Sequence, residues 1–374
     1  YFRVYTDKNS SEIRRYLSAT LKELRWYAEK PYLKGRLPKF VYFGGGTPSY
    51  LSALQLTELT DEMKAILPWH EAEEVTFECE PGTLSEKKLE VIKNFGVTRL
   101  SLGIENFDDH VLEINGRAHR SGEVFRAYEF ARSLGFEQVN VDLIAGMLEE
   151  TEDNWKDSVR QAIELSPDSV TVYQMEIPFN TTIYRNMREE GKLTAPVADW
   201  PTKRRWVDFA FNELEASGYT VTSAYTAVKD PKKTKFVYRD RLWAGADMVA
   251  TGVASFGHLG GIHYQNLAHI ERYEESLEEG RSPLFRALMT SEDERFLREL
   301  ILQWKLGQVH LNYFREKFGE DVEARFEGVL TSLEKRDFLE RGEDELRLTR
   351  QGLLQVDTLL HDFFLEKHQG GRYA

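Results

Sequence analysis

The sequence has little cysteine, no long apolar run and no excess of positive charge, and each absence excludes a class of protein. Its 374 residues contain one cysteine, Cys79, which excludes an internal disulfide framework and suits a reducing compartment. No stretch approaches the roughly 18 uninterrupted apolar residues of a membrane span. The 49 basic and 62 acidic residues give a net charge of −13, whereas nucleic-acid binding requires clustered positive charge. We therefore expect a cytoplasmic protein with no membrane span and no nucleic-acid partner.

The first informative feature that the sequence does contain is a glycine-rich turn. The turn Gly44–Thr47 follows the apolar run 39–43, and glycine at a strand end lets the backbone approach a ligand that any Cβ would block. Thr47 adds a hydroxyl group, and Pro48 stops the strand. On its own, the motif is equally typical of an ordinary tight turn.

The chain repeats the order of strand and helix several times. Strand patterns that run into polar or glycine residues cover 75–83, 98–107, 138–147 and 169–176. Helical patterns lie between them at 89–95 and 127–134, and each ends near a glycine. This order predicts an α/β fold with a parallel but incomplete β/α barrel, and such barrels keep their chemistry at the carboxyl ends of the strands.

The character of the chain changes past the barrel. Helices are predicted at 184–192 and 200–216 and a strand at 219–224, and helical patterns follow at 292–306, 311–318 and 322–335. A predicted hairpin at 338–349 and a final helix complete an order that resembles a winged helix. Its third helix and wing are rich in acidic residues, so a lid or partner surface is favoured over DNA readout. We predict a barrel core at 1–220, a barrel extension and substrate-side segment at 221–289, and a C-terminal helical, winged-helix-like domain at 290–374.

Several motifs occur together in one order. They are Tyr42–Ser49, Glu78 with Pro81-Gly82-Thr83, Ser101-Leu102-Gly103, Gly116–His119 and Asn140–Ile144. As an ordered set they resemble the radical S-adenosylmethionine (SAM) enzymes related to oxygen-independent coproporphyrinogen III oxidase, and the haem chaperones derived from them. The resemblance spans about residues 1–270. It implies a partial (β/α)6-type, TIM-barrel-like radical SAM barrel, with the C-terminal domain covering the substrate opening.

One part of the family pattern is absent from this chain. Members hold a [4Fe-4S] cluster on a Cys-x3-Cys-x2-Cys loop shortly before the glycine-rich turn, whereas this chain has only Cys79, inside a predicted strand. We expect the cluster ligands upstream of Tyr1 and the chain without them to be inactive. The alternative is a natural cluster-free relative. Phe2 matches the aromatic residue that follows the last cluster cysteine in the family. The fourth cysteine that is typical of the true coproporphyrinogen oxidases would fall near Phe2, and its absence argues against that specific activity.

The resemblance also implies which residues bind SAM. The glycine-rich turn would meet the methionine end with Glu78 beside it, and Arg117 would pair with the carboxylate. Glu105, where the family usually has glutamine, and Asp142 would address the ribose or a second SAM. The full predicted set is Phe2, Gly44, Gly45, Gly46, Thr47, Glu78, Glu105, Arg117 and Asp142. A structural ion pair between Arg117 and Glu78 is the alternative for those two residues, and Asp142 requires a partner of some kind because it lies on an apolar strand.

The resemblance implies the following function. A reduced cluster, supplied with electrons by a flavodoxin or ferredoxin, cleaves SAM to a 5′-deoxyadenosyl radical that acts on a tetrapyrrole or natural product. The protein would then be an oxidoreductase or a methyltransferase-like enzyme that oxidises, methylates or cyclopropanates this substrate. The alternative is a non-enzymatic haem chaperone. In the haem-handling motif of those chaperones the histidine is replaced here by Tyr238, and tyrosine can also ligate ferric haem. We take His258, His263 and His269 as structural, and His119 as an exposed helix residue.

Overall fold

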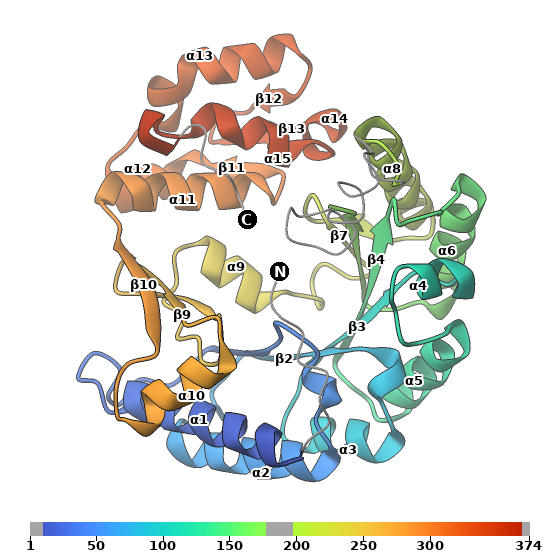
Figure 1. Ribbon diagram of the computed structural model, residues 1–374. Coiled ribbons are helices and arrows are strands. Elements are labelled where there is room, and N and C mark those ends of the chain that lie inside the picture. The colour runs from blue at the N-terminus through green and yellow to red at the C-terminus, as the bar shows by residue number, and fades with distance from the viewer. Residues whose placement is uncertain (1–9, 177–196, 369–374) are drawn as a thin grey trace, which may run out of the picture.

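The fold is described by a computed structural model, which covers residues 10–176 and 197–368. Its largest sheet has the strand order β1-β2-β3-β4-β5-β7-β6, and β1 to β5 are parallel. These strands are β1 Phe40–Phe43, β2 Glu74–Cys79, β3 Arg99–Glu105, β4 Gln138–Ala145 and β5 Ser169–Gln174. The sheet curves around the centre of the molecule, with helices along its outside (Figure 1).

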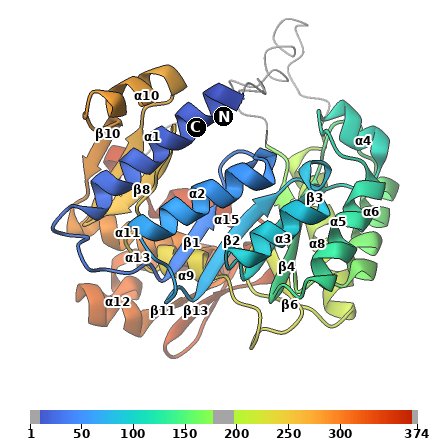
Figure 2. The same ribbon diagram turned by 90° about the horizontal axis from the view of Figure 1, so that it is seen from below.

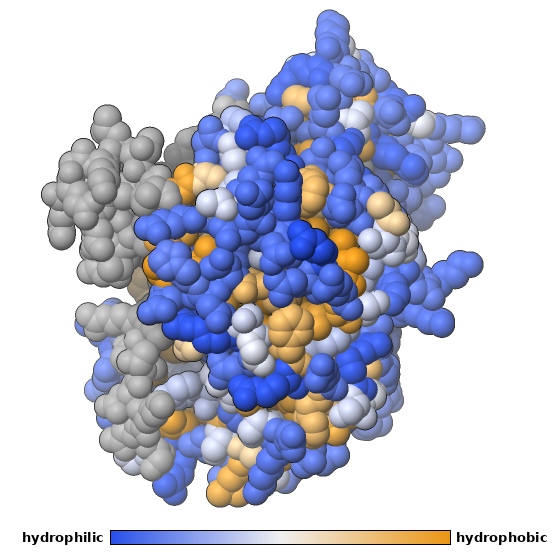
Figure 3. Space-filling model, turned by 90° about the vertical axis from the view of Figure 1, so that its right-hand side faces the viewer, coloured by the Kyte–Doolittle hydropathy of each residue, from blue (hydrophilic) through white to orange (hydrophobic). Residues whose placement is uncertain are grey.

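The barrel part of the chain carries a series of helices between and around these strands. They are α1 Ser10–Ala28, α2 Ala53–Ile66, α3 Glu86–Asn94, α4 Asp109–Ile114, α5 Ser121–Ser133, α6 Glu152–Leu165 and α8 Trp200–Ala216, with the short 3-10 helices η1 Pro48–Tyr50 and η2 Pro81–Thr83. Figure 2 shows α1, α2 and α3 lying in front of the strands. On the side seen in Figure 3, hydrophilic residues dominate the outer surface, and apolar residues show in smaller areas between them.

The two faces of the sheet differ in chemistry because side chains alternate along each strand. The face toward the helices is buried and apolar, with Val75, Phe77, Cys79, Leu100, Leu102, Val139, Val141, Val170 and Val172 in one core. The opposite face lines the inside of the barrel and carries Thr76, Glu78, Ser101, Asn140, Asp142 and Thr171. The register places Glu78 beside Ser101 and Ser101 beside Asn140, so this polar row crosses three strands.

The predicted incomplete parallel barrel is confirmed, with one difference in its last strands. β7 Thr226–Val228 pairs antiparallel with β5 and with β6 Thr220–Val221. β6 and β7 form a hairpin, so β7 returns in the direction opposite to β5, and among the described residues no sixth strand pairs in parallel with the barrel strands. Within those residues β1 pairs only with β2, and the barrel stays open on that side.

The segment after the barrel forms a small sheet and an internal helix. The sheet has the order β10-β9-β8, from β8 Phe256–Leu259, β9 Ile262–Asn266 and β10 Leu284–Met289, with α10 Ile270–Glu278 between β9 and β10. Helix α9 Val237–Trp243 lies inside the ring of elements (Figure 1). The carboxylate of Glu74, at the start of β2, accepts hydrogen bonds from the backbone N–H groups of Val237 and Tyr238. These bonds fix the start of α9 to the barrel.

The C-terminal part has its own hydrophobic core. Its elements are α11 Glu292–Trp304, β11 Gln308–His310, α12 Leu311–Phe318, α13 Val322–Lys335, β12 Leu339–Arg341, β13 Glu345–Leu348, α14 Arg350–Leu353, α15 Val356–Leu359, η3 Leu360–Phe363 and η4 Glu366–His368. The strands form a sheet in the order β11-β13-β12, which confirms the predicted hairpin within a mostly helical region. The expected single final helix is wrong, because the chain there divides into the short helices α14, α15 and η3.

No helix among the described residues has the length and apolar character needed to cross a membrane. The predicted domain boundaries stay a prediction.

Candidate functional site at the carboxyl ends of the barrel strands

The glycine-rich turn encloses the carboxylate of Glu78. The backbone N–H of Gly45 donates to Glu78 Oε2 at 3.2 Å, and the hydroxyl of Tyr42 donates to Glu78 Oε1. A Cβ added to Gly44 would lie 2.7 Å from Glu78 Oε2, so only glycine lets the chain pass so close. Gly45 has a φ of +93°, and a Cβ there or at Gly46 would meet no atom of the described residues within 4 Å. The turn therefore holds the Glu78 carboxylate, a hydrogen-bond acceptor, next to space in which a ligand could lie against Gly45 and Gly46.

A second link fixes the turn to the end of β2. The hydroxyl of Ser49 is buried, lies 2.5 Å from Thr83 Oγ1 and accepts from the backbone N–H of Glu80 at 3.0 Å. Lys88 donates from Nζ to the carbonyl oxygens of Ser49 and Thr83. Thr47 precedes this anchor and is exposed at the rim, where its hydroxyl makes no helix-capping bond. The turn is thus held from behind while its front faces solvent.

Asp142 is the most deeply placed of the predicted site residues. Its partners belong to the protein: Ser101 Oγ donates to Asp142 Oδ2 at 3.1 Å, and Asn140 Nδ2 donates to Oδ1 at 2.8 Å. Burial raises the pKa of Asp142 to about 7, and the nearby Glu78 charge contributes to that rise. Glu78 and Asp142 are therefore brought together by the fold, as two interacting acids on neighbouring parts of one polar row.

Glu105 and Arg117 form an ion pair with each other. Glu105 ends β3 at a register shift that follows Gly103, and its φ of +67° is unusual for a residue with a side chain. Burial raises the pKa of Glu105, and the Arg117 charge opposes that rise. The alternative of an ion pair between Arg117 and Glu78 is wrong, because the bulge turns Glu105 toward Arg117 while Glu78 is occupied by Tyr42 and Gly45.

Tyr238 lies on α9 against the inner side of β1. Its ring stacks on Tyr42 with 4.3 Å between ring centroids, and Phe40 packs on it edge-on. Burial raises the pKa of Tyr238, as does the charge of Glu78. The predicted haem-handling residue and the predicted SAM-binding carboxylate are therefore connected through one aromatic side chain, Tyr42.

The described residues do not fit a [4Fe-4S] cluster. Cys79 is buried on the helix-facing side of β2, and burial raises the pKa of its thiol, which disfavours the thiolate that a cluster requires. Across residues 10–176 and 197–368 there is no group of three or more His, Cys, Asp or Glu side chains placed to hold a metal ion. Phe2 lies outside the described residues.

The environments of the histidines and of Tyr42 could not be fully predicted from the sequence. The expectation of an exposed helical His119 is wrong: the side chain is fully buried before α5, with Nε2 2.9 Å from the carbonyl oxygen of Ile104. His258 and His263 pack together at 4.4 Å, and burial lowers the pKa of both. The sequence motifs do not single out Tyr42 as a site residue, although the alternation along β1 places it on the same face as Gly44.

Comparisons with known proteins agree with the motif set. Residues 11–162 match the Radical SAM superfamily. The heme chaperone HemW of Bacillus subtilis is 29% identical over 318 residues, which is 84% of this chain and 83% of that protein. The oxygen-independent coproporphyrinogen III oxidase of Helicobacter pylori is 23% identical over 375 residues, 96% of this chain and 81% of that protein. The structure of coproporphyrinogen III oxidase HemN from Escherichia coli superposes with a TM-score of 0.82 at 21% identity, over 96% of this chain and 84% of that one.

These matches confirm the predicted resemblance to radical SAM proteins of the coproporphyrinogen oxidase and haem chaperone type. The structural match confirms the predicted fold, an α/β barrel with a mostly helical C-terminal part.

Proposed function

We propose that this relative of the radical SAM coproporphyrinogen oxidases and haem chaperones binds SAM at the carboxyl ends of β1 to β4. The observation that carries the proposal is the Glu78 carboxylate held beside the open turn Gly44–Gly46. SAM presents an ammonium group that needs acceptors, and Glu78 with the carbonyl oxygens of the turn offers them. Asp142 lies in the same polar row as Glu78, Glu105 ends β3 next to that row, and Arg117, between α4 and α5, pairs with Glu105.

The remaining groups of SAM have partners of suitable chemistry nearby. The ribose hydroxyls would be met by Glu105 or Asp142, since carboxylates accept from diols. The SAM carboxylate would be met by Arg117, whose side chain is 39% exposed although it pairs with Glu105. Because a guanidinium carries five N–H donors, Arg117 can keep its ion pair with Glu105 and also donate hydrogen bonds to the SAM carboxylate.

We further propose a tetrapyrrole or natural-product substrate, an oxidoreductase or methyltransferase-like reaction, and electron supply by a flavodoxin or ferredoxin. The similarity to coproporphyrinogen oxidases over most of the chain supports the substrate class. A [4Fe-4S] cluster supplies the electron that cleaves SAM in this superfamily, and the described residues do not fit one. The role proposed for these residues is therefore to bind SAM, to orient it and to exclude water from it.

SAM titration of the variant Glu78→Gln tests the proposal. Replacing the carboxylate by an amide keeps its size but removes the charge that attracts the ammonium group, so we expect the dissociation constant for SAM to rise about tenfold, or about 1.4 kcal/mol. The control is Glu90→Gln, an exposed glutamate on α3, with unchanged affinity. Equal affinity of wild type and Glu78→Gln would refute the assignment of this carboxylate.

A second candidate function is haem binding as a chaperone. It is favoured by the similarity to HemW along most of both chains and by the position of Tyr238 on the inner side of the barrel. The variant Tyr238→Phe keeps the stacking on Tyr42 and removes only the hydroxyl that would ligate ferric iron. If Tyr238 is the ligand, its charge-transfer absorption in the haem complex is lost in Tyr238→Phe and kept in Tyr50→Phe, a variant of an exposed tyrosine. An unchanged haem spectrum would remove Tyr238 from this candidate function.

A further inference from the structure

A pocket lies at the other end of the barrel, where the strands begin. It has a volume of about 230 Å³, and its lining includes Arg99, Arg239, Lys235, Phe236, Thr222 and Gln308. Arg99 opens β3 and Glu105 closes it, so the pocket lies toward the amino ends of the strands, and Arg99 stands two residues before Ser101, the register partner of Glu78. Gln308 comes from β11, and the pocket is therefore shared between the barrel and the C-terminal part.

Arg99 is a buried cation without a carboxylate partner among the described residues. Only 2% of the residue is exposed, and its guanidinium makes two long hydrogen bonds, to Gln138 Oε1 and to Ser169 Oγ, each at 3.3 Å. Its Nε–H has no acceptor in the described part of the chain. Burial lowers the pKa of Arg99, which reflects the cost of holding this charge away from water.

The nearest carboxylates act on Arg99 only through their charge. Those of Glu74 and Asp142 are hydrogen-bonded elsewhere: Glu74 accepts from the start of α9, and Asp142 accepts from Ser101 and Asn140. A structural role for Arg99 as a distant counter-charge to Glu74 is the competing explanation. It does not account for a pocket beside the guanidinium or for further cations around that pocket.

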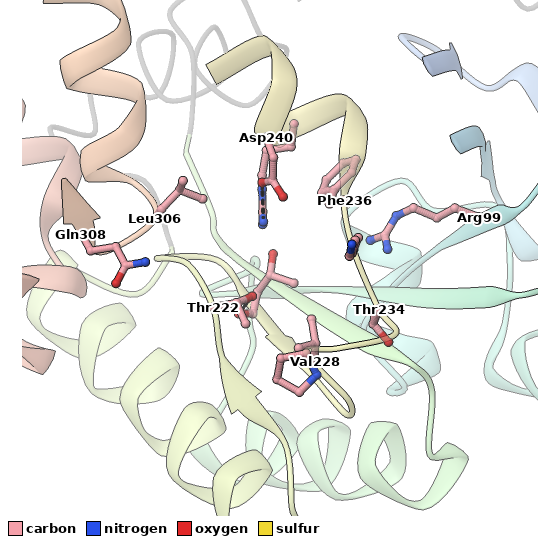
Figure 4. A pocket seen from close by; sticks show the side chains of 12 residues that line it. Arg99, Thr222, Val228, Thr234, Phe236, Asp240, Leu306 and Gln308 are labelled. Carbon is pink, nitrogen blue, oxygen red and sulfur yellow. Dashed lines mark hydrogen bonds and ion pairs between the residues drawn. The ribbon is translucent and has the colours of Figure 1, made fainter. Parts of the chain in front are cut away.

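The side chains around the pocket converge on it from several elements (Figure 4). The ring of Phe236 lies between two guanidinium groups, 4.4 Å from that of Arg99 and 5.3 Å from that of Arg239. Arg239 is 12% exposed and already pairs with Asp240. With Lys235 the lining holds three cationic side chains and one acidic side chain, in a chain whose net charge is −13. The local excess of positive charge suits a doubly charged anion.

We propose that this pocket binds a phosphate group, held by the guanidinium groups of Arg99 and Arg239. Planar guanidinium groups match phosphate oxygens in pairs, and a dianion compensates more than one cation. The phosphate group comes from free inorganic phosphate or from a small phosphate monoester, for which the pocket leaves additional room. A phosphate bound in this pocket would lie between Arg99, the first residue of β3, and the segment that leads into β11.

Calorimetric titration of the whole chain with sodium phosphate, at an ionic strength balanced with sodium chloride, tests the proposal. We expect saturable binding by wild type and a dissociation constant at least tenfold higher for Arg239→Gln. The control Arg126→Gln changes an arginine on α5 whose side chain is 78% exposed, and it should bind like wild type.

The outcomes separate the proposal from its alternatives. Absence of saturable phosphate binding by wild type, or equal affinity in Arg239→Gln and wild type, overturns it. A parallel titration with methyl phosphate distinguishes the sources: tighter binding of the ester assigns a phosphate monoester, and tighter binding of the inorganic ion assigns free phosphate. Because the lining of this pocket includes neither Glu78 nor the turn Gly44–Gly46, SAM affinity should be the same in Arg239→Gln and wild type.

Discussion

Asp142 is the residue at which the proposed site is most sensitive to pH. Its pKa of about 7 lies above the ordinary value near 3.9, so the folded state binds a proton that the unfolded state has released. Between about pH 4 and pH 7 stability therefore falls as the pH rises, and the full cost, up to about 4 kcal/mol, applies above pH 7. The cost arises mainly from burial and in part from Glu78.

The variant Asp142→Asn should remove this cost, because the amide stays neutral at every pH. We expect urea unfolding at pH 8 to show the variant stabilised relative to wild type by on the order of 2 kcal/mol. At pH 4 the gain should disappear, since wild-type Asp142 is then protonated in the folded state. The variant Asp61→Asn, at an exposed position on α2, should show the same small effect at both pH values. A pH-independent effect of Asp142→Asn would contradict the account.

At the scale of elements, the buried carboxylate of Glu74 holds the start of α9 to β2. Glu74 is buried and accepts from Val237 N, Tyr238 N and the hydroxyl of Thr76. In Glu74→Gln one acceptor oxygen becomes an NH2 group that faces an N–H donor, which leaves a buried donor unpaired. We expect a loss of about 1–3 kcal/mol in the free energy of unfolding, measured by urea denaturation.

The neighbouring Glu73 is a matched control for this prediction. It is exposed and pairs with Arg241 on the surface, so Glu73→Gln should cost less than about 1 kcal/mol. Equal losses in the two variants would mean that the backbone bonds of α9 to Glu74 contribute nothing specific.

Elements with strong local signals were predictable from the sequence, and elements that depend on long-range pairing were not. The helices at 200–216 and 322–335 have the predicted bounds because each joins an apolar periodicity to an aspartate N-cap, Asp199 or Asp321. The predicted strand 219–224 is reduced to Thr220–Val221, because the hairpin with β7 turns directly after it. The predicted helix at 184–192 lies outside the described residues.

At the scale of the whole molecule, the two ends of the barrel differ in how far the sequence can predict them. The carboxyl-end groups lie within short ordered motifs, so the sequence alone assigns Glu78 and Asp142 to one site. The pocket at the amino end joins Arg99 to residues 222–240 and 306–308, which are far apart in sequence. No local pattern reports such a combination, because the antiparallel return of β7 and the docking of β11 create it.

Hydrogen–deuterium exchange with and without SAM shows whether SAM binds at the carboxyl ends of the barrel strands, as we propose. We expect slower exchange on adding SAM for the amides of residues 43–47 and 103–106, and no change for residues 229–235, which precede α9. Exchange that stays unchanged at 43–47, or that slows at 229–235 instead, would show that SAM does not bind there.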